Sequence, residues 1–115
     1  MQERRRHIRV ATPVMLQFPS PETMKSERSY SLDVSESGLR FSTTVKFQVG
    51  QEIPMTLQLP FNDNAMHATG AVSWVREIAR HGETQYEVGV QFRWMEDPDR
   101  QRLNRHLGSV FKGRV

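Results

Sequence analysis

The sequence contains no cysteine among its 115 residues. Disulfides, cysteine nucleophiles and cysteine metal ligands are therefore excluded, and a reducing compartment is compatible with the composition. Long apolar runs are also missing, so no segment is expected to span a membrane. The N-terminus is rich in charge and lacks the apolar core of a signal peptide. We therefore expect a cytoplasmic protein.

Sequence signatures of enzymes are equally scarce. The seven glycines form neither a GxxxxGK nor a GxGxxG loop, and there is no G-x-S-x-G sequence. The four histidines have no spacing typical of metal ligands. We expect no catalytic residue, no metal site and no cofactor, and hence a protein that is not an enzyme.

The charged residues that are present are unevenly distributed. The formal net charge is +3 and the pI is about 9.8, which favours anionic partners. Four arginines lie within the first nine residues: Arg4, Arg5, Arg6 and Arg9. At this length the chain fits one domain, expected to span 1–115, with a flexible arginine-rich arm at 1–9.

Alternation of apolar and polar residues is the dominant pattern after the arm. Alternation places one set of side chains on one face of a strand. Six segments show it: Val10–Phe18, Tyr30–Val34, Leu39–Val45, Ile53–Leu59, Val72–Trp74 and Val88–Trp94. No helical pattern separates them. The chain is therefore expected to be mainly all-β, with a six-stranded antiparallel β-barrel over 10–95.

The C-terminal segment has helical rather than strand periodicity. Asp97 as N-cap and Pro98 at the first helical position are typical of a helix start, and Gly113 is expected to end the helix. Leu103, Leu107, Val110 and Phe111 then form one apolar stripe. A C-terminal α-helix is expected over 97–112, packed on an opening or a side of the barrel.

The arginines of the arm suit a nucleotide ligand. An arginine guanidinium can donate two parallel hydrogen bonds to a phosphate, or to O6 and N7 of guanine. Taken alone, however, a basic arm is more often a solvated tail.

A polar turn at 33–38 offers complementary groups. Asp33 and Ser35 are two residues apart and are expected on the outer face, with Leu32 and Val34 pointing into the core. Asp33 can accept hydrogen bonds from N1–H and the 2-amino group of guanine. Gly38 permits close backbone approach or a positive φ. Alone, this Asp-Ser-Gly pattern is equally typical of a β-turn.

The two motifs together change the interpretation. Arg5 to Arg9 reads R-x-x-x-R, and Asp33 to Gly38, which reads D-x-S-x-x-G, begins 24 residues after Arg9. This pair, in this order, resembles the PilZ domain family. The segments 70–74 and 86–92 resemble the last two strands of that family, so the resemblance covers nearly the whole chain. It implies a PilZ-type barrel and a cytoplasmic bacterial receptor for the second messenger cyclic di-GMP.

The resemblance also implies residue roles. Arg5 and Arg9 would contact guanine edges and phosphates, Asp33 and Ser35 would contact a guanine, and Gly38 would keep the surface beside it open. Arg4, which precedes the first motif arginine, resembles the basic residue of relatives that bind an intercalated pair, so two stacked cyclic di-GMP molecules per chain are expected. The positions of Gly70, Trp74 and Gly89 look structural in the family and are not assigned to the ligand.

Three hypotheses follow from these observations. The first is a ligand sensor whose arm closes over cyclic di-GMP and signals to an unknown downstream protein. The second is a PilZ-like adaptor that binds only a protein, against which the intact motifs argue. The third is a binder of single-stranded nucleic acid, which needs exposed aromatic side chains. Because nearly all aromatic residues are expected to point inward, we expect no nucleic acid partner.

Overall fold

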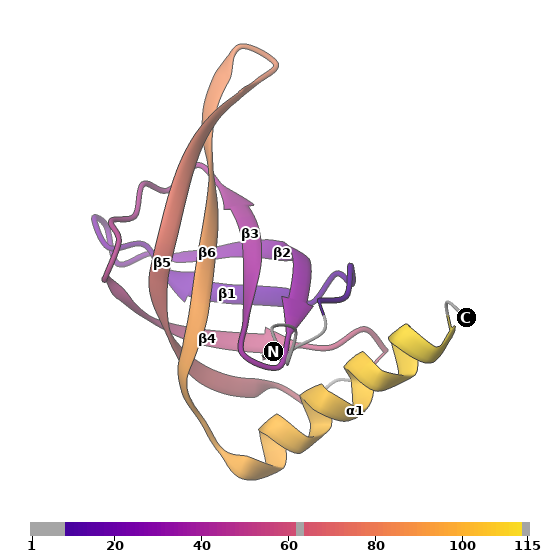
Figure 1. Cartoon of the computed structure of the whole chain (residues 1–115). Coiled ribbons are helices and arrows are strands. Elements are labelled where there is room, and N and C mark those ends of the chain that lie inside the picture. The colour runs from indigo at the N-terminus through magenta and orange to yellow at the C-terminus, as the bar shows by residue number, and fades with distance from the viewer. Residues whose placement is uncertain (1–8, 62–63, 114–115) are drawn as a thin grey trace, which may run out of the picture.

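A computed structural model describes residues 9–61 and 64–113. Within these ranges the chain forms six strands and one helix: β1 (Met15–Pro19), β2 (Ser26–Ser35), β3 (Gly38–Thr43), β4 (Glu52–Gln58), β5 (Met66–Arg80), β6 (Glu83–Met95) and α1 (Asp97–Gly113). Neighbouring strands are antiparallel and close into a barrel in the order β1-β2-β3-β6-β5-β4 (Figure 1). The predicted six-stranded antiparallel barrel with a C-terminal helix is confirmed.

The first strand is shorter than predicted, although its burial pattern is as expected. Val10, Thr12 and Val14 are buried like the inward residues of β1, yet β1 begins only at Met15. Proline at position 13 has no N–H to donate to a neighbouring strand. Val10 instead forms an isolated antiparallel bridge with Val34 of β2.

Register shifts explain the outward side chains that alternation assigned to the interior. On β2 the register shifts between Ser31 and Asp33, so Leu32 is an extra residue. A β-bulge of this kind reverses which alternate positions face inward. Tyr30 and Leu32 are therefore exposed, whereas the prediction placed Leu32 in the core. Two further shifts between β5 and β6 leave Trp74 and Trp94 exposed in the same way.

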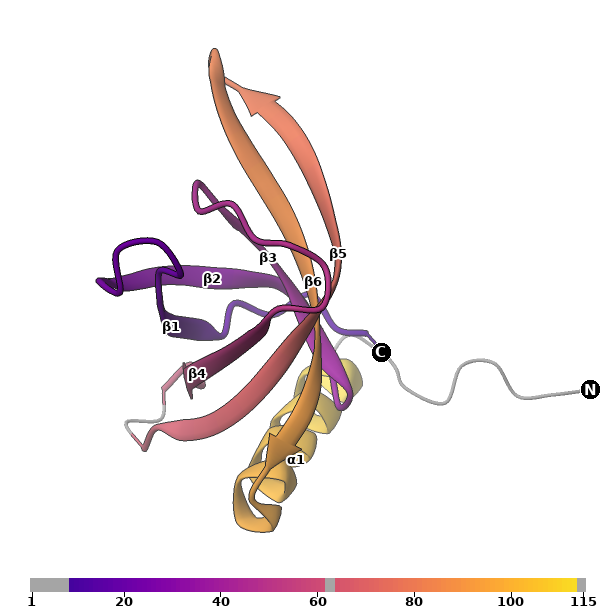
Figure 2. The same ribbon diagram turned by 90° about the vertical axis from the view of Figure 1, so that its left-hand side faces the viewer.

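The β5–β6 hairpin is much longer than the segments predicted for it. Its outer half is exposed or half-buried on both faces, so the sequence there has no apolar alternation to detect. The two turn residues, His81 and Gly82, have φ of 55° and 77°, a conformation that suits tight hairpins. Figure 2 shows the hairpin projecting beyond the rest of the barrel.

The barrel interior is filled by apolar side chains from every strand. Three phenylalanines, Phe18, Phe41 and Phe47, have ring centroids 5.3–6.4 Å apart, a spacing at which aromatic rings attract one another. Leu103 and Leu107 of α1 belong to the same buried cluster. The helix therefore packs against one end of the barrel, as Figure 2 shows.

The start of α1 is shifted by one residue from the predicted cap. The Glu96 carbonyl accepts the Arg100 N–H at 2.9 Å, so Glu96 rather than Asp97 is in the capping position. Asp97 and Asp99 lie in the first turn, where the helix dipole favours acidic groups. No helix within the described ranges is both long and apolar enough to cross a membrane.

A polar contact joins α1 to the segment that precedes β1. His106 Nε2 lies 3.2 Å from the hydroxyl of the buried Thr12. Burial lowers the pKa of His106 below its ordinary value of 6.5, because the imidazolium loses solvation.

The lowered pKa predicts a pH dependence of stability. At pH values above the range in which His106 of the unfolded chain takes up a proton, its contribution to the free energy of unfolding is fully present. As the pH falls from about 7.5 towards 5.5, the unfolded chain binds the proton first, so the free energy of unfolding decreases. Urea unfolding at both pH values should show this slope, and His106→Gln should reduce it. His67→Gln, at an exposed position, is the control; a slope that survives His106→Gln unchanged contradicts the assignment.

Candidate functional site

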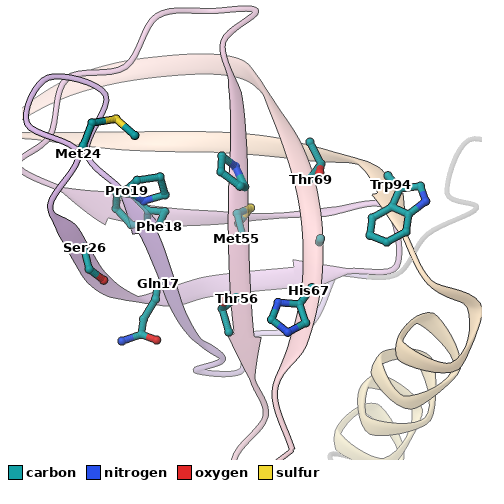
Figure 3. Close-up of a pocket in the computed structure, with 12 residues that line it drawn as sticks. Gln17, Phe18, Pro19, Met24, Ser26, Met55, Thr56, His67, Thr69 and Trp94 are labelled. Carbon is teal, nitrogen blue, oxygen red and sulfur yellow. The ribbon is translucent and has the colours of Figure 1, made fainter.

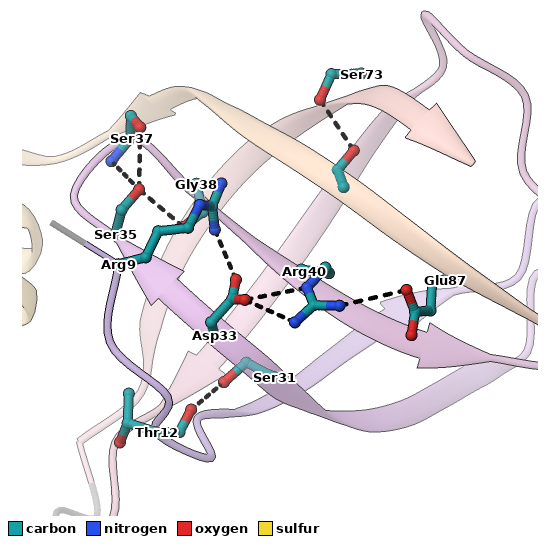
Figure 4. A network of polar contacts seen from close by, with 11 residues as sticks. Arg9, Thr12, Ser31, Asp33, Ser35, Ser37, Gly38, Arg40, Ser73 and Glu87 are labelled. Atoms are coloured by element: carbon teal, nitrogen blue, oxygen red, sulfur yellow. Dashed lines mark hydrogen bonds and ion pairs between the residues drawn. The ribbon is translucent and has the colours of Figure 1, made fainter. Parts of the chain in front are cut away.

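The two sequence motifs meet at the start of the described chain. The backbone N–H and C=O groups of Val10 and Val34 exchange hydrogen bonds of 2.8 and 2.9 Å. This bridge brings Arg9 beside Asp33, where Arg9 Nη1 donates to Asp33 Oδ1 at 2.6 Å (Figure 4). One arginine of R-x-x-x-R and the first residue of D-x-S-x-x-G are thus in direct contact.

A second arginine, which the sequence motifs do not include, holds the same carboxylate. Arg40 of β3 lies opposite Asp33 of β2. Its Nε and Nη2 atoms donate to Asp33 Oδ2 at 3.0 and 2.8 Å. The hydrogen bonds to Asp33 raise the pKa of Arg40 above its ordinary value. Asp33 therefore accepts three charge-assisted hydrogen bonds from two guanidinium groups.

The contacts continue across two more strands. Glu87 of β6 is buried, and its Oε1 atom accepts from Arg40 Nη1 at 3.3 Å and from Arg76 Nη2 of β5 at 2.6 Å. Together Arg9, Asp33, Arg40, Glu87 and Arg76 form an alternating series of charges, which we call the charge row. Figure 4 shows its members Arg9, Asp33, Arg40 and Glu87. A buried carboxylate requires such partners, since an unpaired buried charge is strongly destabilising.

Sequence reasoning missed Arg40, Glu87 and Arg76. The only signal available was opposite charge at cross-strand positions, such as the Arg76–Glu87 pair. Using that signal requires the register, and the register shifts that set it were not foreseen.

Ser35 does not lie where the alternation placed it. It was expected on the outer face beside Asp33, but its exposed fraction is only 1%. The Ser35 hydroxyl accepts the Ser37 N–H at 3.2 Å and lies 3.0 Å from the Ser37 hydroxyl. At the end of β2, after the bulge, Val34 and Ser35 are both buried. In this conformation Ser35 stabilises the turn.

Gly38 also has a packing role. It is buried, and the glycines with positive φ in the described ranges are Gly50 and Gly82, not Gly38. A Cβ atom on Gly38 would lie 2.0 Å from the Val90 carbonyl oxygen of β6. Gly38 therefore permits close approach of the β3 and β6 backbones. It does not adopt the left-handed conformation of a turn, and it does not form an open surface.

Trp74 and Gly89 lie on the same outward surface as the charge row. Gly89 pairs with Arg40 on one side and with Trp74 on the other. A Cβ atom on Gly89 would lie 2.1 Å from Trp74 Nε1, so the indole ring covers this glycine. Gly89 is structural, as expected, whereas Trp74 is also partly exposed beside the site.

The expectation that nearly all aromatic residues point inward is wrong. Tyr30 on β2, Trp74 on β5 and Trp94 on β6 are exposed on the barrel, for the bulge-related reasons given above. The argument against a nucleic acid partner therefore loses its premise. These three aromatic residues lie on three different strands.

Another part of the barrel surface carries a hollow of about 440 Å³ beside β1, β4, β5 and β6 (Figure 3). His67 and Trp94 are among its lining residues, and the others are apolar or neutral. It contains none of the motif residues. Within the described ranges, no three potential metal-binding side chains lie close enough to hold an ion. Arg4 and Arg5 lie outside the described residues.

The fold and the site define a class of protein: a small antiparallel barrel with arginines gathered on an acidic residue at the end of β2. Comparison with protein families identifies the class. The PilZ domain family matches this chain over residues 3–109, so the chain belongs to that family. PilZ domains are non-catalytic, which agrees with the expectation that the chain is not an enzyme. No curated protein matches the sequence.

Solved structures show the same fold at low sequence identity. The inhibitor of motility MotI/DgrA from Bacillus subtilis matches with a TM-score of 0.80 and 16% identity, covering 99% of this chain and 54% of that one. The PilZ domain of Escherichia coli YcgR with c-di-GMP matches with a TM-score of 0.71 and 15% identity, covering 96% and 94%. The K. pneumonia MrkH–c-di-GMP complex matches with a TM-score of 0.78 and 17% identity, covering 97% of this chain and 54% of that one. The chain thus spans about half the length of MotI/DgrA and of MrkH.

The packing of Gly38 gives a prediction about stability. Gly38→Ala should lower the free energy of unfolding by about 1–3 kcal/mol, because the new methyl group collides with the β6 backbone. Gly108→Ala is the matched control, since a Cβ atom there meets nothing within 4 Å. In the helix it should raise the free energy of unfolding by about 0.5–1 kcal/mol. Urea titrations measure both; equal stability of Gly38→Ala and the parent would refute the packing role.

Proposed function

We propose that this chain is a receptor for cyclic di-GMP that binds the ligand at the Arg9–Asp33 contact. The observation that carries the proposal is the direct meeting of the two motifs, at 2.6 Å, on the outer face of the barrel. The family and the two ligand-bound structures described above support it.

The charges around this contact suit a dianionic dinucleotide. Arg9 is half-exposed, so its guanidinium can turn from Asp33 to a phosphate or to a guanine edge. Asp33 can then accept hydrogen bonds from the N1–H and 2-amino groups of guanine. In this proposal Arg5 and Arg4 add further guanidinium groups from the arm, with Arg4 favouring a second stacked ligand.

Ser35 and Gly38 contribute to the proposed site differently from Asp33. Their burial means that they maintain the turn and the β3–β6 packing on which Asp33 depends. Substituting them would thus impair binding indirectly, through the shape of the barrel end.

Ligand binding requires an exchange of partners. Without ligand, the Arg9 guanidinium is paired with the Asp33 carboxylate. With ligand, the guanidinium and the carboxylate would each contact the nucleotide. In this proposal the exchange draws the arm onto the barrel. A downstream protein then recognises the surface that the arm and the barrel form together. An ordered arm has less conformational freedom, which reduces the net binding energy.

Calorimetric titration with cyclic di-GMP tests the proposal, with GTP and cyclic GMP as control ligands. Arg9→Ala and Asp33→Ala should each weaken binding by about tenfold to a hundredfold, since hydrogen bonds to charged groups contribute about 1.5–3 kcal/mol. Arg80→Ala, at the exposed end of β5, is the matched control and should bind like the parent.

The same titration measures stoichiometry. Two ligands per chain are predicted for the parent and one for Arg4→Ala. Parent-like binding by Arg9→Ala would place the site elsewhere. If cyclic di-GMP neither binds nor raises the melting temperature of the parent, the protein-binding adaptor becomes the better hypothesis.

A further inference from the structure

We infer that Arg40 is a positioning residue for the ligand: it anchors Asp33 through Oδ2, so that Oδ1 is the oxygen that Arg9 vacates for guanine. This inference rests on the proposed function and extends it to two residues outside both motifs, Arg40 and its partner Glu87.

The two arginines hold Asp33 in unequal ways. Arg9 makes one hydrogen bond, to Oδ1, and its side chain is 52% exposed. Arg40 makes two, both to Oδ2, and its side chain is 33% exposed. Arg40 also lies in β3, which is paired with β2 on one side and β6 on the other. Arg9 is therefore the partner that the ligand displaces, and Arg40 is the partner that stays.

Glu87 fixes the plane of the Arg40 guanidinium. Arg40 uses Nε and Nη2 for Asp33 and Nη1 for Glu87, so its donors face carboxylates on both sides. The Glu87 side chain is only 9% exposed and is held in turn by Arg76. A planar guanidinium can span two carboxylates in this way, whereas a lysine ammonium cannot reproduce the geometry.

This anchoring has a consequence for base recognition. With Oδ2 occupied by two donors, the carboxylate cannot rotate freely, and Oδ1 stays directed towards the place that Arg9 now occupies. A fixed acceptor discriminates between bases better than a rotating one, because a binding site gains selectivity when its contact groups are held in place. Arg40 should therefore affect selectivity for guanine as well as affinity.

Calorimetry on four variants tests the inference with two ligands, cyclic di-GMP and its hypoxanthine analogue, which lacks the 2-amino groups. Arg40→Met should weaken cyclic di-GMP binding by about tenfold, the loss expected for one charge-assisted contact. It should also move the ratio of the two dissociation constants towards one. Arg40→Lys should restore part of the affinity but not the ratio.

A double variant separates positioning from folding. Arg40→Met alone leaves the buried Glu87 with a single partner, which can destabilise the fold. Combining Arg40→Met with Glu87→Gln also removes the charge of the Glu87 carboxylate. This double variant should regain stability while still binding cyclic di-GMP weakly. Arg80→Met is the control: Arg80 is exposed at the end of β5 and lies outside the charge row, so affinity and ratio should stay close to the parent values.

The outcomes distinguish the inference from the proposed function. If the parent does not bind cyclic di-GMP, both fail. If the parent binds and Arg40→Met or the double variant binds equally well, only the positioning role fails. If Arg40→Met weakens both ligands equally and leaves the ratio unchanged, Arg40 acts on the fold alone and the inference is also overturned.

Discussion

The Asp33 carboxylate is shared by two guanidinium groups that come from different parts of the chain. Arg9 approaches from the segment before the barrel and Arg40 from the neighbouring strand, and together they donate three hydrogen bonds. The position of Asp33 in turn depends on the bulge at Leu32, which sets the face of β2 that the end of the strand presents. The geometry of the site therefore follows from one irregularity in the barrel.

The charge row also shows how a small barrel accommodates a buried acid. Glu87 is buried in β6, yet it accepts hydrogen bonds from arginines on both neighbouring strands. The row contains three arginines and two carboxylates, so it keeps one net positive charge on this surface. In the proposed function that excess complements an anionic ligand, so the ion pairs that stabilise the barrel would also prepare the site.

Much of the fold could be predicted from the sequence, because alternation and turn residues are local signals. The turn between Ser35 and Gly38 was foreseen, and the structure confirms it. Of the apolar stripe predicted for α1, Leu103 and Leu107 are buried and Val110 packs against the core, but Phe111 is exposed. The outward orientation of the Leu32, Trp74 and Trp94 side chains was not foreseen, because each residue lies at or beside a register shift that no local pattern marks. In the candidate site, the motifs pointed to Arg9 and Asp33. Arg40 stayed hidden because its role depends on which residue the neighbouring strand places opposite it.

A crystal structure of the chain with cyclic di-GMP tests the proposed exchange of partners at the Asp33 carboxylate. We expect a guanine donor to replace Arg9 at Asp33 Oδ1 while both hydrogen bonds from Arg40 to Oδ2 remain. A ligand bound away from Asp33, or an Arg9–Asp33 contact that persists beside the bound ligand, would contradict it.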